Sequence, residues 1–221
     1  IFGTCGGGLA LVPSLTDFTF MEEKNAKLFV NSPNAIDGNR VEKCDTSSAA
    51  FQSEETGLVD FTGSEEDILS QIRSLVTILP ANNEDDMSYS ECTDDLNRVC
   101  SDLENYAGAT DLALAQISDD NFFLEVKKNY DKSMVTGFIR LNGTTVGCVA
   151  NRTAVYAADG VKEDEFDAVL SANGAEKAAK FVSFCDAFNI PLLTLVNVKG
   201  YKATVCAEKH IAKAAAKLTY A

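Results

Sequence analysis

Apolar and polar positions recur with different periods along the chain, and each period predicts a different element. The clearest helical period begins after Ser64, where apolar side chains share one face over residues 68–79 until Pro80 ends the pattern. Ser64 and Asp67 have the spacing of a capping box, with Asp in place of the usual Glu or Gln. Residues 27–30 form a short apolar run that ends in an Asn-Ser-Pro turn, which predicts a short buried strand.

The second half of the chain has the pattern of strands joined by a hairpin. Apolar runs at 122–126, 134–141 and 145–150 predict three strands, and Asn142-Gly143 supplies a tight turn between the last two. A helical pattern and a further apolar run follow this hairpin. This alternation predicts an α/β layer fold with crossover helices.

Residues 184–201, FCDAFNIPLLTLVNVKGY, are the most informative stretch. They predict the end of an amphipathic helix of about 175–188, a sharp turn, a wholly buried strand at 192–196 and a glycine-bearing bend. Ligands of α/β proteins are usually held at the carboxyl end of such a strand. Three weaker patterns predict a short helix at 111–117, an acidic loop or short helix at 161–173, and a last helix from about residue 207.

A change of composition marks the middle of the chain. Residues 81–105 are acidic and poor in large apolar side chains, which is typical of a linker. We therefore expect parts of two domains, residues 1–80 and 106–221, on either side of this linker. Because the chain starts without Met in a strand–turn pattern and stops within a helical one, we interpret it as an internal fragment of a longer protein.

Charge and hydropathy narrow the class of function. Apolar residues make up 46% of the chain, enough for a core, but no run approaches the roughly 20 apolar residues of a membrane span. The net charge of −14 argues against nucleic acid as a partner, because phosphates would be repelled. The acidic net charge does not exclude a polyanionic ligand such as a CoA nucleotide, which can bind where Lys, Arg or helix N-termini gather locally. Without a signal peptide, a cytoplasmic location is expected.

The cysteines and the single histidine predict no metal centre. Seven cysteines is an odd number, and none of them forms a C-x-x-C pair. With His210 as the only histidine, a zinc site is not expected, and reduced thiols are the favoured interpretation.

Five ordered blocks of the chain resemble one family, the beta-type carboxyltransferase subunits of biotin-dependent acyl-CoA carboxylases and decarboxylases. GTCGGGLALVPSLTDFTFM resembles the family's G-x-x-x-G-G-A-x-x-x-P-A-L-T-D-F-x-F-M run, and FCDAFNIPLLT is near-identical to a run that precedes its D-x-P-G-F bend. The matching blocks cover nearly the whole chain and lie at 3–21, 27–36, 122–152, 176–194 and 215–221.

This resemblance implies a crotonase-type (ClpP/crotonase) fold, a ββα superhelix, with parts of two such domains in the chain. It implies transfer of a carboxyl group between N1 of carboxybiotin and the α-carbon of a short acyl-CoA, acetyl- or propionyl-CoA. Biotin would be carried on a partner, a biotin carboxyl carrier protein, acting with biotin carboxylase or with membrane decarboxylase subunits. The family also implies a homo-oligomer, no metal, and departing biotin as the group that takes the α-proton.

Two glycine turns are the candidate site residues. Gly7 and Gly8 occupy the family's N-domain oxyanion position, where backbone N–H groups can stabilise an enolate because glycine allows close approach. A tight strand-to-helix bend that only glycine can make is the competing explanation on spacing alone. Gly200 and Tyr201 match the Gly-Phe of the bend on the biotin side, although this bend has lost the family's Asp and Pro. A plain strand-ending turn explains them equally well.

Departures from the family pattern leave two alternatives open. Ser47-Ser48 stand where two glycines are expected, and Asp60 stands in place of His. These changes favour a non-catalytic scaffold, whereas retention of Gly7 and Gly8 favours the enzyme. A decarboxylase subunit that moves CO2 from malonyl- or methylmalonyl-CoA onto biotin is a variant of the same chemistry.

A basic stripe at Lys209, Lys213 and Lys217 lies on the last predicted helix. Such a stripe is usually a solvated helix face. In an acidic protein it could alternatively meet a CoA phosphate or a partner subunit. His210 beside it is interpreted as structural, not as a base.

Overall fold

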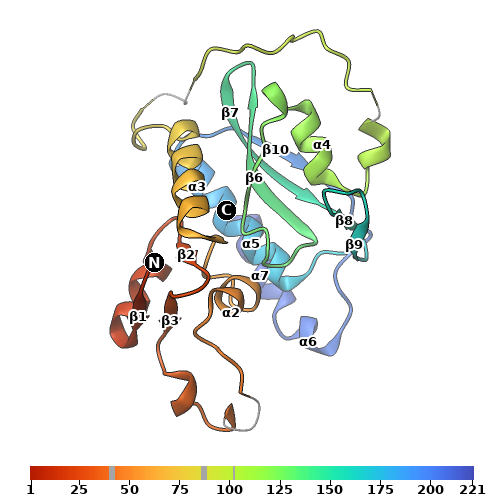
Figure 1. Ribbon diagram of the computed structural model, residues 1–221. Helices are drawn as coiled ribbons and strands as arrows, with labels where there is room; N and C mark the ends of the chain where they lie inside the picture. The colour runs from red at the N-terminus through yellow and green to blue at the C-terminus, as the bar shows by residue number, and fades with distance from the viewer. Residues whose placement is uncertain (40–42, 86–88, 102) are drawn as a thin grey trace. The chain divides into compact units, whose positions relative to one another are not determined.

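A computed structural model describes two compact units of the chain (Figure 1). The described residues are 1–39, 43–85, 89–101 and 103–221. Unit 1 comprises residues 1–74 and 127–130, and unit 2 comprises residues 75–126 and 131–221. Helices and strands occur in both units, as the predicted α/β class requires.

Unit 1 is built from short parallel strand pairs and helices. Strand β1 pairs with β3, and β2 pairs with β4. Its core is formed by small and medium apolar side chains, among them Met21, Leu28 and Val59, which are at most 1% exposed. The elements of this part are β1 (Thr4–Gly6), the 3-10 helix η1 (Gly7–Leu15), β2 (Phe20–Glu22), β3 (Lys27–Phe29), η2 (Pro33–Ala35), α2 (Ala49–Glu54), β4 (Phe61–Gly63) and most of α3 (Glu65–Ile78), whose residues from Leu75 onward belong to unit 2.

The predicted helix after Ser64 is α3, and its capping box is confirmed. The Asp67 N–H donates to Ser64 Oγ (3.2 Å), and the Ser64 N–H donates back to Asp67 Oδ2 (3.1 Å). The apolar face is narrower than predicted, because Leu69 and Val76 are 49% and 69% exposed. Ile78, in the last turn of α3, is buried.

Unit 2 is organised around a four-stranded sheet in the order β10-β7-β6-β5. The β6–β7 hairpin is antiparallel, and β10 pairs parallel with β7 after the crossover through α5, as predicted. The elements are η3 (Leu103–Tyr106), α4 (Thr110–Ile117), η4 (Asp119–Asn121), β5 (Leu124–Val126), β6 (Met134–Leu141), β7 (Thr144–Asn151), β8 (Ala154–Tyr156), β9 (Lys162–Glu165), α5 (Ala172–Ala187), β10 (Leu192–Leu195), α6 (Val205–Glu208) and α7 (Ile211–Tyr220).

Helices cover both faces of the β6–β7 hairpin. On one face, Leu114 of α4 packs into a buried cluster with alternate residues of β6 and β7, such as Ile139 and Cys148. On the other face, Phe181 of α5 packs against Phe138, with ring centroids 5.0 Å apart. Side chains of successive residues in a strand point to opposite faces, so one hairpin can serve both layers.

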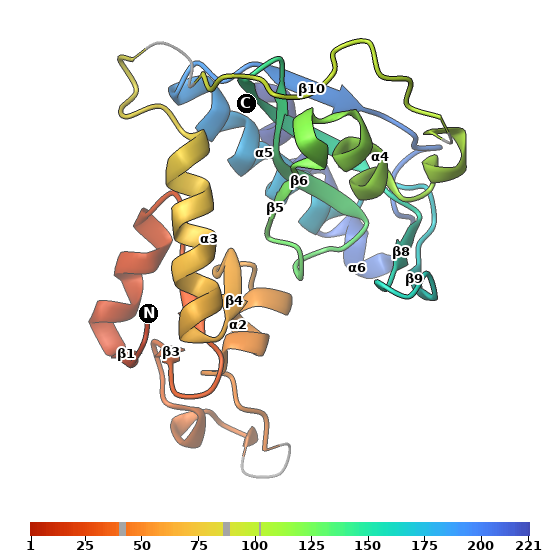
Figure 2. The same cartoon turned by 45° about the horizontal axis from the view of Figure 1, so that its top comes forward.

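Three sequence predictions in unit 2 were wrong in detail. Strand β10 is not wholly buried: Leu192 is 39% exposed and Val196, just past its end, is 71% exposed. Among the described residues β10 pairs only with β7, so it lies at an edge of the sheet (Figure 2). The acidic stretch after Val161 contains strand β9, paired with β8, and the last predicted helix is divided into α6 and α7.

The predicted linker falls within unit 2, and some of its residues are hydrogen-bonded to other parts of that unit. Arg98 donates to the carbonyls of Gln116 and Ser118, each at 2.7 Å, and so caps the carboxyl end of α4. Tyr89 forms a β-bridge with Thr144. The extent of the linker, 81–105, includes residues outside the described ranges and stays a prediction.

Candidate functional site

The Gly6–Gly8 turn joins β1 to η1, and its three glycines face different surroundings. A Cβ on Gly6 would lie 2.8 Å from the Phe29 ring, so this position needs glycine for packing. Gly7 has φ of +65°, a conformation that disfavours residues with a side chain. Gly8 has neither constraint: its φ lies outside the left-handed region, and a Cβ there would meet no atom within 4 Å.

The turn leads directly into the start of a 3-10 helix. Gly7 and Gly8 are the first two residues of η1, where the initial N–H groups of a helix lack intrahelical acceptors. Gly8 is exposed and Gly7 is half-buried, so a ligand atom can reach both. Packing and turn geometry explain the glycines at positions 6 and 7, whereas neither explains the glycine at position 8.

Both departures from the family pattern in unit 1 have structural explanations. Ser48 is the N-cap of α2, and its hydroxyl accepts from the Phe51 N–H at 3.2 Å. Asp60 accepts from the Thr19 N–H (2.7 Å) and forms a buried ion pair with Lys127 (2.9 Å). Its carboxylate is therefore engaged within the fold.

In unit 2, a pocket of about 350 Å³ opens where β7 and β10 end. We call it the strand-end pocket. Its walls are mostly apolar, with Tyr106, Thr110, Asn151 and Asn197 as polar residues, which is typical of small-molecule sites. The lining residues are Leu103, Tyr106, Ala107, Thr110, Ala113, Ile117, Asn151, Leu195, Val196 and Asn197.

The bend predicted to carry site residues begins at this pocket but extends away from its lining. Asn197 lines the pocket, whereas Gly200 and Tyr201 do not. Gly200 has φ of +156°, and its carbonyl accepts from the Leu170 N–H at 2.9 Å. Tyr201 forms a parallel β-bridge with Leu170 and is 59% exposed.

Sequence reasoning missed Asn151 and Tyr106 as pocket residues. Asn151 could have been found, because it ends β7 and the carboxyl ends of parallel strands share one edge of a sheet. Tyr106 belongs to the short 3-10 helix η3 before α4, and no periodic pattern marks it. The four predicted site residues fall in separate units, Gly7 and Gly8 in unit 1 and Gly200 and Tyr201 in unit 2.

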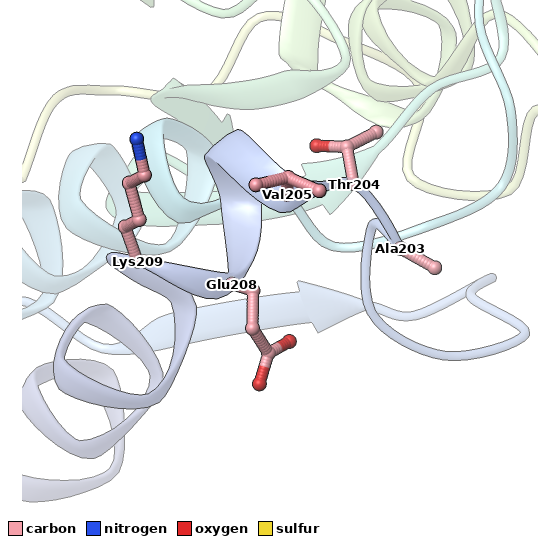
Figure 3. Close-up of a pocket in the computed structure, with 5 residues that line it drawn as sticks. All are labelled: Ala203, Thr204, Val205, Glu208 and Lys209. Carbon is pink, nitrogen blue, oxygen red and sulfur yellow. The ribbon is translucent and has the colours of Figure 1, made fainter.

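A second hollow, of about 540 Å³, lies at α6 and is lined by Ala203, Thr204, Val205, Glu208 and Lys209. Figure 3 shows the Glu208 and Lys209 side chains pointing in opposite directions. Its charged groups therefore do not converge on one ligand atom. Lys209 belongs to the cap of α6, whereas Lys213 and Lys217 belong to α7, so the predicted basic stripe spans two helices.

Neither a metal-ligand cluster nor a membrane-spanning helix is found among the described residues. Within residues 1–39, 43–85, 89–101 and 103–221 there is no group of three or more His, Cys, Asp or Glu able to hold a metal ion. Across the same residues, no helix has the length and apolar character needed to cross a membrane.

Known proteins resemble this chain over its whole length. The profile of the family described as "Carboxyl transferase domain" matches residues 1–221. The chain is 35% identical to the carboxyltransferase subunit of propionyl-CoA carboxylase from Haloferax mediterranei, and 33% identical to the methylmalonyl-CoA decarboxylase subunit alpha from Propionigenium modestum. Each alignment covers 100% of this chain but 43% of the relative, so the chain spans less than half the length of these curated relatives.

A solved structure agrees with the sequence comparison. Transcarboxylase 12S, a hexamer whose structure has hydrolysed methylmalonyl-CoA bound, matches with a TM-score of 0.84 and 33% identity. The match covers 100% of this chain and 43% of that one.

Proposed function

The chain belongs to the carboxyl transferase family, and we propose that the protein containing it transfers a carboxyl group between biotin and a short acyl-CoA. The family has the crotonase-type fold, which the sequence resemblance also implied. The names of the relatives favour propionyl-CoA and methylmalonyl-CoA as the acyl pair over acetyl-CoA. Biotin, carried on a partner protein, supplies a ureido nitrogen that holds the carboxyl group during transfer.

The observation that carries the proposal is the open, unstrained backbone at Gly8. Loss of the carboxyl group from the α-carbon places negative charge on the thioester oxygen as an enolate forms. The N–H groups of Gly7 and Gly8 can donate to that oxygen, because they begin η1 and no atom lies within 4 Å of the Cβ position of Gly8. We assign these two residues as the oxyanion site and the bend at Gly200 and Tyr201, with the strand-end pocket, as the biotin side.

Decarboxylation is a second candidate for the direction of the reaction. The 33% identical relative from Propionigenium modestum is a methylmalonyl-CoA decarboxylase subunit. The same oxyanion site would serve both directions, because the enolate is common to them. The partner subunits would then decide the direction: biotin carboxylase with a carrier protein for carboxylation, or membrane decarboxylase subunits for the reverse.

We further propose that the protein is a homo-oligomer. Helix η1 exposes an apolar surface beside the Gly7–Gly8 turn, where Leu9 is 60% and Leu15 is 86% exposed. Leu11 and Val12 add to it, at 57% and 52%. Contiguous apolar surface of this kind commonly marks a protein interface.

Substitution of Gly8 tests the oxyanion assignment. In the protein encoded by the complete reading frame, we expect Gly8→Ala to slow carboxyl transfer from methylmalonyl-CoA to free biotin, and Gly8→Val to slow it by roughly a hundredfold or more. The added side chain would occupy the space in front of the N–H groups. Acyl-CoA binding should be weaker but present, and the free energy of unfolding of Gly8→Ala should stay within about 0.5 kcal/mol of wild type.

Gly3→Ala is the matched control for this experiment. Gly3 also has open space around its Cβ position and no left-handed φ, so the same methyl group is added nearby without blocking the turn. Transfer should be unchanged in this variant. Full activity of Gly8→Val would sink the oxyanion assignment, and a folded wild-type protein that binds CoA but transfers nothing to biotin would favour the scaffold alternative.

A further inference from the structure

Arg152 is a fully buried cation in unit 2, directly after the end of β7. Its side chain is 0% exposed, and that of Glu125 on β5 is 8% exposed. Nη1 of Arg152 lies 3.2 Å from Glu125 Oε2 and 3.5 Å from Asp111 Oδ2. Its Nε donates to the Lys132 carbonyl, so the guanidinium contacts strand β5, helix α4 and the segment before β6.

Arg152, Lys177, Glu125 and Asp111 form a cluster of two positive and two negative side chains, and some of their polar atoms lack hydrogen bonds. Lys177 of α5 is 2% exposed and donates to the Met134 carbonyl at 2.6 Å. Nη2 of Arg152 lies 3.0 Å from Glu125 Oε1, yet neither atom has a well-aligned hydrogen bond with the described residues. Oδ1 of Asp111 has no such bond either. Two cations and two carboxylates thus share one largely buried site, where an unpaired charge is costly.

Two members of this cluster lie directly beside residues of the strand-end pocket. Asp111 follows Thr110, and Arg152 follows Asn151; Thr110 and Asn151 both line the pocket. The Thr110 hydroxyl donates to the Asn151 carbonyl at 3.0 Å. The N–H groups of Thr153 and Ala154 donate to the Gly108 carbonyl, at 2.8 and 3.0 Å. The end of β7 and the start of α4 are therefore joined by hydrogen bonds and by the Arg152–Asp111 ion pair.

We propose that Arg152 is a positioning residue for the strand-end pocket. Its pairing with Asp111 and Glu125 fixes the first turn of α4 against the end of β7, and so holds the two walls that carry Thr110 and Asn151. The ion pairs lie behind the pocket and do not themselves contact the ligand. This inference rests on the proposed function, in which the pocket belongs to the biotin side.

Weakening the Arg152 ion pairs should change the Michaelis constant for free biotin but not that for methylmalonyl-CoA. In the full-length protein, Asp111→Asn and Arg152→Lys are mild changes, because the first keeps a polar isostere and the second keeps the positive charge. We expect the KM for free biotin to rise about tenfold in Arg152→Lys and less in Asp111→Asn, since misplaced binding contacts are costly. The KM for methylmalonyl-CoA should stay within about twofold of wild type.

Asp164→Asn is the matched control. It removes one carboxylate from the partly exposed Lys132–Asp164 ion pair (2.8 Å), away from the pocket lining, and should leave both constants unchanged. The positioning role is wrong if both constants shift together with a falling melting temperature, which is the signature of general destabilisation. It is also wrong if folded Asp111→Asn and Arg152→Lys leave the KM for biotin unchanged.

A readout without catalysis separates this inference from the proposed function. If wild-type protein transfers no carboxyl group, the proposed function fails, and amide hydrogen exchange then tests the positioning role. The Thr153 and Ala154 amides, bonded to Gly108, should exchange faster in Asp111→Asn than in Asp164→Asn. Equal exchange in the two variants would overturn the inference.

Discussion

Glu125 illustrates how burial and ion pairing compete at a single residue. Burial raises the pKa of the Glu125 carboxyl, Asp111 adds to this effect, and Arg152 and Lys177 oppose it. The pKa stays above its usual value although Arg152 lies 3.0 Å away, which means that desolvation outweighs the ion pair.

The raised pKa of Glu125 fixes the sign of a pH effect. A carboxyl with a raised folded pKa contributes most stability below its unfolded pKa, about 4.3, and loses that contribution as pH rises through the folded value. The amount by which wild type is more stable than Glu125→Gln should therefore be largest below about pH 4.3 and shrink as the pH rises above it. Urea unfolding at a series of pH values measures it.

Glu163→Gln, at an exposed position in β9, is the control and should change the free energy of unfolding by less than about 0.5 kcal/mol. A Glu125→Gln difference that grows with pH would show that the ion pair with Arg152 outweighs burial.

At the scale of single residues, the sequence shows which residues are candidates for a function but not which atoms surround them. The family resemblance singled out Gly7 and Gly8, but only the structure separates Gly6, which packs on Phe29, from Gly8, which has open space at its Cβ position. Likewise, the sequence marked Asp60 as a departure from the family pattern. Its partner Lys127 is 67 residues away, a pairing that no local pattern reveals.

Among the elements, α3 shows how local signals fix a helix boundary. Hydrogen bonding from the Ser64 side chain and backbone lowers the pKa of the Asp67 carboxyl. These contacts are short-range, so the sequence was sufficient to locate the start of α3. By contrast, the burial of β10 depends on what pairs with its outer edge, which an apolar run cannot show.

Removal of the Ser64 cap should weaken α3 measurably. We expect Ser64→Ala to lower the free energy of unfolding by about 1 kcal/mol at pH 7, because the Asp67 N–H loses its acceptor. Chemical denaturation measures this loss.

Ser70→Ala, an exposed substitution within the same helix, should cost less than about 0.5 kcal/mol. Equal effects of Ser64→Ala and Ser70→Ala would mean that the cap contributes nothing beyond helix propensity.

At the scale of the whole molecule, a short segment of the chain between two stretches of unit 2 belongs to unit 1. Residues 127–130 belong to unit 1, although β5 before them and β6 after them belong to unit 2. Lys127 donates to the Gly57 carbonyl and pairs with Asp60, and both side chains of the pair are at most 6% exposed. Tyr130 covers Gly57, where a Cβ would lie 2.7 Å from its ring. The amino-acid composition reveals the acidic stretch that begins near residue 81, but it does not reveal that residues 127–130 belong to unit 1.

The Asp60–Lys127 pair should be strongly coupled. Lys127→Met leaves a buried carboxylate without its cation, which we expect to cost about 3–5 kcal/mol of unfolding free energy. The double variant with Asp60→Asn should lose less than the sum of the two single variants. Urea unfolding of the four proteins gives the coupling.

Lys27→Met, which breaks the exposed Lys27–Asp45 pair, is the matched control and should cost at most about 1 kcal/mol. Additive losses for Asp60→Asn and Lys127→Met would contradict a direct energetic link between them.

The return of residues 127–130 limits how this polypeptide can be divided in the laboratory. A truncation after residue 80 would look reasonable from composition, yet it would encode Asp60 without Lys127 and Gly57 without Tyr130. The truncated product would have to bury a lone carboxylate or expose the interior around it. Unit 1 is therefore not a contiguous genetic module, and a shuffled or separately expressed version of it would need those four residues grafted back.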